Sequence, residues 1–168
     1  MKINKSLFFF FLVLLSMAKL KSQTVISKAY SLTLKTLLSH SVQEIDVQEA
    51  AKLKDVIFID AREEQEYKVS HLKDAIWVGF DNQDLSKLNK IDKNQTLVVY
   101  CSVGFRSEKT IEKLNKMGYS AVYNLYGGIF EWKNQNQAVY RNHKETEEVH
   151  AYNKMWGFWL DKGIKVYD

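Results

Sequence analysis

The chain of 168 residues contains no proline and only one cysteine, Cys101. The lack of proline carries no inference about the fold, but a single cysteine excludes an internal disulfide. The sequence also lacks internal repeats and low-complexity linkers, and its histidines do not have metal-ligand spacing. In an oxidising compartment a lone thiol is a liability unless it is buried or used. Cys101 is therefore either an inert buried side chain or a reactive one.

Positive charge in excess is confined to the first 22 residues. The chain has 24 Lys and Arg against 20 Asp and Glu, and four of the lysines lie in residues 1–22, which hold no acid. The remainder has 20 side chains of each sign and no net charge. This balance excludes the basic footprint of a nucleic-acid-binding protein and a polybasic membrane patch.

Residues 1–22 are predicted to form a signal peptide. Lys2 and Lys5 precede an apolar run at 7–15 that is too short to span a bilayer comfortably, and Ser22 precedes the expected cleavage point. An uncleaved membrane anchor is the alternative, whereas a lipoprotein anchor is excluded because no cysteine is near. We expect export to the bacterial periplasm or cell envelope.

Apolar strands that alternate with short helices predict an α/β fold. Strands are expected at residues 56–59, 75–78, 96–100 and 121–124. Helices are expected at 47–53, where Asp46 is the N-cap, and at 63–69, 84–88, 106–117 and 128–134. The alternation predicts a central parallel sheet of about five strands with helices on both faces.

The sequence divides into a core domain, assigned to residues 44–141, and two extensions. Residues 23–43 contain apolar side chains at helical spacing and predict a helix that packs on the core. Residues 142–168 are an aromatic extension, with a polar linker expected at 143–148 and a helical segment with Trp156 and Trp159 after it. This segment is expected to dock on the core, and a partner-binding or dimerising helix is the alternative.

Cys101 is predicted to lie at a strand-to-helix turn. It opens the segment Cys101-Ser102-Val103-Gly104-Phe105-Arg106-Ser107, between an apolar run and an amphipathic stretch. Backbone N–H groups and a helix N-terminus stabilise negative charge there, so a thiolate is a ready nucleophile. Because Asp60 also follows an apolar strand, both residues should line the carboxyl edge of the sheet, where ligands bind.

The length of this loop favours sulfur over phosphate. Four residues separate Cys101 from Arg106. The loop of tyrosine and dual-specificity phosphatases needs five, so that it can wrap a tetrahedral phosphate. A tighter loop suits one sulfur atom carried on the cysteine as a persulfide.

Four segments, in order, resemble the rhodanese family of sulfurtransferases over roughly residues 44–135. They are Asp60-Ala61-Arg62 with Glu66-Tyr67, His71 with Ala75, the loop from Cys101 to Ser107, and Leu125-Tyr126-Gly127-Gly128 with Trp132. The chain departs from the family around His71, where Ser70, Lys73 and Asp74 replace its Gly and Pro-Gly. That departure affects the geometry of a turn rather than the chemistry.

The resemblance implies a single-domain, rhodanese-like sulfurtransferase that works through a persulfide on Cys101. The thiolate takes the outer sulfur of thiosulfate or a similar anionic donor, and a thiol, cyanide or protein acceptor then removes it. No metal and no organic cofactor are required. The expected substrate site is the loop, in which backbone amides surround the sulfur, a glycine lets the chain curl and an arginine attracts the donor: Ser102, Val103, Gly104, Phe105 and Arg106.

Several nearby residues have two interpretations. Three charged residues either act on substrate or form an ion-pair network that braces the loop, which is the expectation: Asp60, Arg62 and Glu66. Ser107 is expected to support the site as a helix cap, and His71 as a structural turn residue rather than a general base. The ring of Phe105 points either into the core or over the mouth of the pocket.

Three other functions stay open. The loop length argues against a phosphatase or arsenate reductase. The presence of both Cys101 and Arg106 argues against a non-catalytic interaction module. A sulfur carrier that docks a protein partner through Trp156 and Trp159 remains an alternative.

Overall fold

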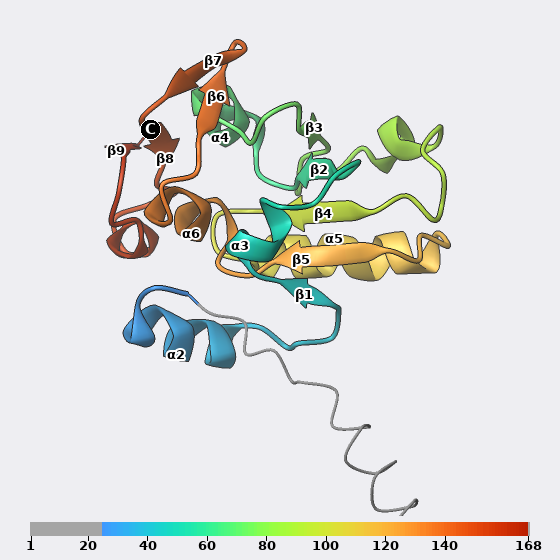
Figure 1. Cartoon of the computed structure of the whole chain (residues 1–168), viewed down its shortest axis with the longest axis horizontal. Coiled ribbons are helices and arrows are strands. Elements are labelled where there is room, and N and C mark those ends of the chain that lie inside the picture. The colour runs from blue at the N-terminus through green and yellow to red at the C-terminus, as the bar shows by residue number, and fades with distance from the viewer. Residues whose placement is uncertain (1–24, 168) are drawn as a thin grey trace, which may run out of the picture.

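The computed structural model describes residues 25–167 (Figure 1). The predicted signal peptide at residues 1–22 lies outside this range. Among the described residues, no helix combines the length and the apolar character needed to cross a membrane.

Helices and short strands alternate along the chain as far as residue 134. In order they are α2 (Lys28–Leu37), β1 (Glu44–Ile45), α3 (Val47–Ala50), β2 (Ile57–Asp60), α4 (Glu64–Val69), β3 (Ile76–Trp77), the 3-10 helix η1 (Leu85–Leu88), β4 (Leu97–Tyr100), α5 (Phe105–Lys116), β5 (Val122–Leu125) and α6 (Gly128–Asn134). The C-terminal part adds β6 (Val139–Arg141), β7 (Lys144–Thr146), β8 (Glu148–His150), the 3-10 helix η2 (Trp156–Trp159) and β9 (Ile164–Val166).

Five of the strands form one parallel sheet in the order β1-β5-β4-β2-β3. The central strand β4 is fully buried, as its continuous apolar run predicts. The expected parallel sheet of about five strands is confirmed, and the predicted strands and helices lie within a few residues of the observed ones.

The sheet separates two apolar cores. Along β4, Val98 and Tyr100 pack into one core while Leu97 and Val99 pack into the other, because successive side chains of a strand point to opposite faces. Residues of α2, α3 and α6 belong to the first core and residues of α5 to the second. Figure 1 shows α3 in front of the sheet and α5 behind it, so helices on both faces are confirmed.

The predicted N-terminal helix is present as α2 and packs on the core. Ser27 caps it by accepting a hydrogen bond from the Tyr30 amide, and Tyr30 and Leu34 are buried. The Tyr30 hydroxyl donates to the Gly127 carbonyl at 2.9 Å, which ties α2 to the start of α6.

The polar linker predicted at 143–148 is wrong. Strands β6 and β7 form an antiparallel hairpin there, and β8 pairs in parallel with β9. Asn142 and His143 make the hairpin turn with positive φ angles of 50° and 62°, without the glycine that usually marks such a turn. Because Lys144 and Glu145 face solvent, a polar sequence is compatible with this strand.

The aromatic segment docks on the core, as expected, but its helical part is the single 3-10 turn η2. The Trp159 ring stacks on Tyr30 of α2 with centroids 5.2 Å apart. Asn134 of α6 donates to the Trp159 carbonyl and accepts from the amides of Asp161 and Lys162. Both extensions therefore meet beside the carboxyl edge of the sheet (Figure 1).

Candidate active site

Cys101 lies in the loop between β4 and α5, at the carboxyl edge of the sheet. Gly104 is the N-cap of α5 and has a φ of 122°, which side-chain-bearing residues rarely adopt. The amides of Ile129 and Phe130 at the start of α6 donate to the carbonyls of Cys101 and Ser102, at 2.9 and 3.2 Å. The start of α6, which follows the Gly127-Gly128 turn, therefore fixes the backbone of the loop through these two hydrogen bonds.

The Cys101 side chain is only 1% exposed, yet it is not enclosed by apolar groups alone. Its Sγ accepts a hydrogen bond from the Gly104 amide at 3.1 Å, and the Ser107 hydroxyl lies 3.6 Å away. In the described part of the chain, the other loop amides make no hydrogen bond to this sulfur. Several backbone amides were expected to surround the sulfur, but its observed hydrogen-bonding neighbours are one amide and one hydroxyl.

Ser107 and Asn124 orient the Gly104 peptide. The Ser107 hydroxyl lies 3.0 Å from the Gly104 carbonyl and 2.7 Å from Oδ1 of Asn124, whose Nδ2 donates to that same carbonyl at 3.0 Å. The predicted capping role of Ser107 is wrong, because α5 begins at Phe105 and Ser107 lies within its first turn. Its support of the site comes through Asn124, on β5.

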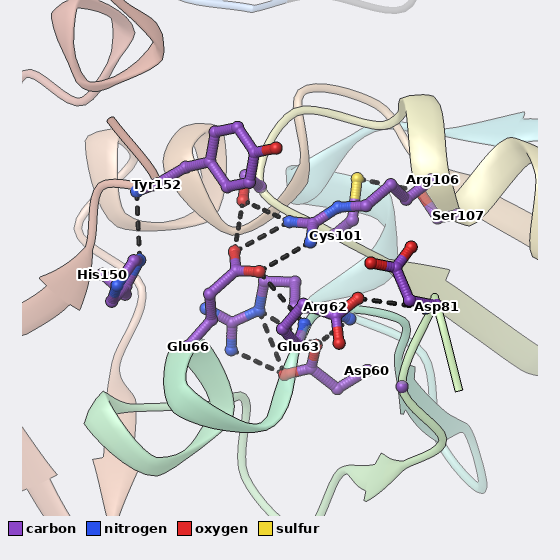
Figure 2. Close-up of polar contacts among 12 residues, drawn as sticks. Asp60, Arg62, Glu63, Glu66, Asp81, Cys101, Arg106, Ser107, His150 and Tyr152 are labelled. Carbon is purple, nitrogen blue, oxygen red and sulfur yellow. Dashed lines mark hydrogen bonds and ion pairs between the residues drawn. The ribbon is translucent and has the colours of Figure 1, made fainter. Parts of the chain in front are cut away.

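Arg106 makes a two-pronged ion pair with Glu66 of α4. Its two terminal nitrogens lie 2.6 and 2.7 Å from the Glu66 carboxylate oxygens, and one of them donates to the Ser102 hydroxyl at 3.0 Å. Ser102 also donates to Glu66, at 2.9 Å. Figure 2 shows Glu66 facing the guanidinium, so the charge expected to attract the donor is already paired.

The pKa values of both Glu66 and Arg106 are shifted in this buried ion pair. Burial on its own would raise the pKa of Glu66, but the hydrogen bonds and charge of Arg106, assisted by Arg62, lower it from 4.5 to about 2. Burial would lower the pKa of Arg106, whereas Glu66 and the charge at Cys101 raise it above its ordinary value. Glu66 is therefore a carboxylate at every physiological pH and is not poised for proton transfer.

Asp60 and Arg62 form a second ion pair beneath the first. Both side chains are fully buried, with Nη2 of Arg62 2.6 Å from Asp60 and 2.7 Å from the Ser70 carbonyl. The Arg62 guanidinium also lies over the Tyr100 ring, 5.5 Å from its centroid. The ion pairs expected of these residues are present: Glu66 is hydrogen-bonded to Ser102 and Arg106, and Arg62 acts on Glu66 through its charge.

Cys101 lines a cavity of about 230 Å³ at the edge of the sheet. The other lining residues come from α2, the loop, α5 and the C-terminal segment: Leu37, Ser102, Val103, Phe105, Arg106, Tyr152 and Trp156. The Phe105 ring is 42% exposed and lies over this pocket rather than in the core. Gly104 supports the loop without lining the cavity.

His71 is apart from this cavity. Its Nδ1 lies 2.9 Å from the Leu72 carbonyl, its ring stacks on Tyr67, and it lines a separate small cavity with Tyr140 and His143. The structure therefore places His71 in a turn, as expected, and away from the sulfur.

The structure adds four residues that no sequence motif assigned to the site. Leu37, Tyr152 and Trp156 line the cavity, and Asn124 positions the Gly104 peptide. The spacing of the aromatic residues Tyr152 and Trp156 indicated that this segment packs on the core, but it did not indicate that they lie beside Cys101. Nothing local to Leu37 or Asn124 could have indicated their place.

Comparisons with known proteins agree with this architecture. A family model for the rhodanese-like domain matches residues 45–135, more than half of the chain. The chain is 38% identical over 92 residues to the tRNA uridine(34) hydroxylase of Hamiltonella defensa subsp. Acyrthosiphon pisum (strain 5AT), covering 52% of this chain and 26% of that protein. It therefore spans about a quarter of that relative's length.

A second curated relative is shorter than this chain and is matched over most of its own length. The thiosulfate sulfurtransferase GlpE of Coxiella burnetii (strain RSA 331 / Henzerling II) is 28% identical over 98 residues, which are 58% of this chain and 90% of that protein.

Solved structures show the same fold. The BH2092 protein of Bacillus halodurans has a TM-score of 0.54 at 23% identity, over 68% of this chain and 85% of the other. The thiosulfate sulfurtransferase of Pseudomonas aeruginosa has a TM-score of 0.55 at 18% identity, over 71% and 23%. Because the matched residues 45–135 include the Cys101 loop and strands β2 to β5 of the sheet, the chain belongs to the rhodanese-like domain family.

Proposed function

We propose that this protein is a sulfurtransferase that carries sulfane sulfur on Cys101. The observation on which the proposal rests is the position of Cys101, which lines a cavity at the end of β4 and whose Sγ accepts a hydrogen bond from the Gly104 amide. The likeness to a protein named thiosulfate sulfurtransferase, over 90% of that protein's length, supports it.

In the first half-reaction the Cys101 thiolate attacks the outer sulfur of thiosulfate or a similar donor. A bond forms between the two sulfurs, the bond between the outer sulfur and its carrier breaks, and the electron pair leaves with sulfite or the corresponding sulfinate. The Gly104 amide and the helix N-terminus stabilise the anionic sulfur before and after the transfer.

In the second half-reaction an acceptor nucleophile such as a thiol or cyanide attacks the outer sulfur of the persulfide. The Cys101 thiolate is then the leaving group, and the enzyme returns to its starting state. Ping-pong kinetics are expected because the two substrates react in separate steps. A protein partner that accepts the sulfur fits the same scheme.

The ion-pair network holds the loop during both steps. Glu66 accepts from Ser102 and pairs with Arg106, so the two ends of the loop are joined through one carboxylate. We propose that this cross-link, and not a free positive charge, is the main contribution of Arg106. We also propose, from the signal peptide predicted at residues 1–22, that the protein acts in the bacterial periplasm or cell envelope.

Intact-protein mass spectrometry of the full chain tests the proposal. After exposure to a sulfane donor, the wild type should gain one sulfur atom, which cyanide then removes. The Cys101→Ser variant should gain none. Absence of any gain with thiosulfate, thiosulfonates and polysulfide would refute sulfur transfer, and hydrolysis of an aryl phosphate would instead support the phosphatase alternative.

A further inference from the structure

The Cys101 cavity is lined mostly by apolar side chains. Some of them come from α2 and from the C-terminal segment, which lie outside the matched domain. Leu37 on α2 and Tyr152 and Trp156 of the C-terminal segment line it together with Val103 and Phe105 of the loop. Residues 45–135 are those that the family model covers, so both extensions complete this pocket. A pocket built in this way is a feature of this chain rather than of the domain alone.

The cavity offers little to a small inorganic anion. Among the described residues that line it, Arg106 is the only basic side chain, and both oxygens of Glu66 pair with its guanidinium. The Tyr152 ring lies over the same guanidinium, and Cζ of Arg106 is 5.1 Å from the ring centroid (Figure 2). A dianion such as thiosulfate would lose its hydration on entering this cavity. The Arg106–Glu66 ion pair carries no net charge and therefore would not compensate for that loss.

The position of Tyr152 over the site is specifically maintained. Its φ angle is +64°, a conformation that is uncommon for a residue with a side chain. Its backbone amide donates to Nδ1 of His150 at 3.1 Å, and His150 is only 2% exposed. Figure 2 shows the ring reaching from this segment toward Arg106. The fold thus places an aromatic ring above the site at a conformational cost.

We propose that the sulfane donor used at this site is an organic compound with a small apolar body, such as an aryl thiosulfonate or an aromatic persulfide. This inference rests on the proposed sulfur transfer and narrows its substrate class. The cavity volume of about 230 Å³ lies below the range of about 300–1,000 Å³ that drug-sized ligands occupy, so the body is one ring or a short alkyl chain. Its apolar surface is buried against Tyr152, Trp156 and Phe105.

The reaction with an aryl thiosulfonate balances without a further reagent. The Cys101 thiolate attacks the terminal sulfur of the donor, and the bond from that sulfur to the sulfonyl group breaks. The electron pair leaves with the aryl sulfinate, and Cys101 is left as a persulfide anion. The ring of the leaving group stays among the apolar walls until it diffuses out.

The test compares benzenethiosulfonate, methanethiosulfonate and thiosulfate as donors to the full wild-type chain. The rate of persulfide formation on Cys101 is followed by intact mass, and each rate is divided by that of the same donor with a free low-molecular-weight thiol. We expect the normalised rate with benzenethiosulfonate to exceed that with methanethiosulfonate roughly tenfold or more. Thiosulfate should be the poorest of the three.

Variants locate the preference. Tyr152→Ala and Trp156→Ala should bring the benzene-to-methane ratio close to one, whereas Met155→Ala should leave it unchanged. Met155 is the matched control because it lies in the same segment, is 68% exposed and does not line the cavity. If a variant unfolds, a wild-type measurement serves instead: unreactive benzenesulfonate should slow alkylation of Cys101 where methanesulfonate does not.

The outcomes separate this inference from the function on which it rests. If Cys101 gains sulfur from no donor, the proposed function is refuted. If it gains sulfur but the two thiosulfonates react alike, or thiosulfate exceeds both, sulfur transfer stands and the apolar donor class is refuted.

Discussion

Replacement of Glu66 by glutamine should destabilise the protein by about 3 kcal/mol at neutral pH. Glu66 is 1% exposed and its pKa in the folded chain is about 2, against an ordinary value of 4.5. This depression corresponds to about 3 kcal/mol of preference for the carboxylate over the neutral acid. Because glutamine has the shape of the neutral acid, Glu66→Gln should lose that amount, which agrees with the cost of breaking a buried ion pair.

The loss should depend on pH in a defined direction. A carboxyl group whose pKa is depressed by folding stabilises the protein above the unfolded value of about 4.5 and stops doing so as the pH falls to about 2. The wild type should therefore lose its advantage over Glu66→Gln between these pH values. Urea unfolding followed by tryptophan fluorescence, at pH 7 and at steps from pH 5 to pH 2.5, measures the difference.

Glu64→Gln on the same helix is the matched control. Glu64 pairs with Lys68 at 2.8 Å, but the two side chains are 56% and 67% exposed, so the pair contributes little. The reasoning is refuted if Glu66→Gln costs no more than Glu64→Gln at pH 7, or if its cost stays constant down to pH 2.5.

Three further changes test the packing around the loop. Gly128→Ala should abolish both folding cooperativity and sulfur transfer, because its Cβ would lie 2.4 Å from the Cys101 carbonyl oxygen at a φ of 59°; a soluble, active variant with a wild-type melting temperature would contradict this. Asn124→Leu removes the Nδ2 donor to the Gly104 carbonyl and the Oδ1 atom that lies 2.7 Å from the Ser107 hydroxyl, and we expect a loss of about 2 kcal/mol in urea unfolding together with slower alkylation by iodoacetamide. Asp60→Asn removes one partner of a fully buried ion pair and should cost about 3–5 kcal/mol by the same method, so a change below 1 kcal/mol would show that the pair is dispensable.

The central sheet was predictable because its signals are local. Strand β4 is a continuous apolar run whose alternate residues enter two cores, and α5 follows it with an amphipathic pattern. The loop between them, with Cys101 at its start and Gly104 before the helix, follows from these two boundaries. The β6–β7 hairpin was missed because its strands are short and polar and its turn contains Asn142 and His143 instead of glycine.

The partners of the site residues depend on contacts between distant parts of the chain. Arg106 and Glu66 are 40 residues apart, and Ser107 and Asn124 are 17 apart, yet each pair is in hydrogen-bond contact. A positive charge near the sulfur is readable from the sequence, but its neutralisation by Glu66 is not. Side-chain pairing across elements depends on how α4 packs beside the loop, which no local pattern encodes.

The strand-to-helix turn that presents Cys101 could be predicted from the chain alone, since hydrophobic periodicity and loop length are properties of neighbouring residues. The surroundings of the sulfur could not be predicted in this way, because Leu37, Tyr152 and Trp156 reach one cavity from opposite ends of the chain. Burial and pairing are properties of the assembled fold. The sequence predicts that Arg106 attracts an anion, whereas in the structure Arg106 is paired with Glu66 at the wall of a mostly apolar pocket.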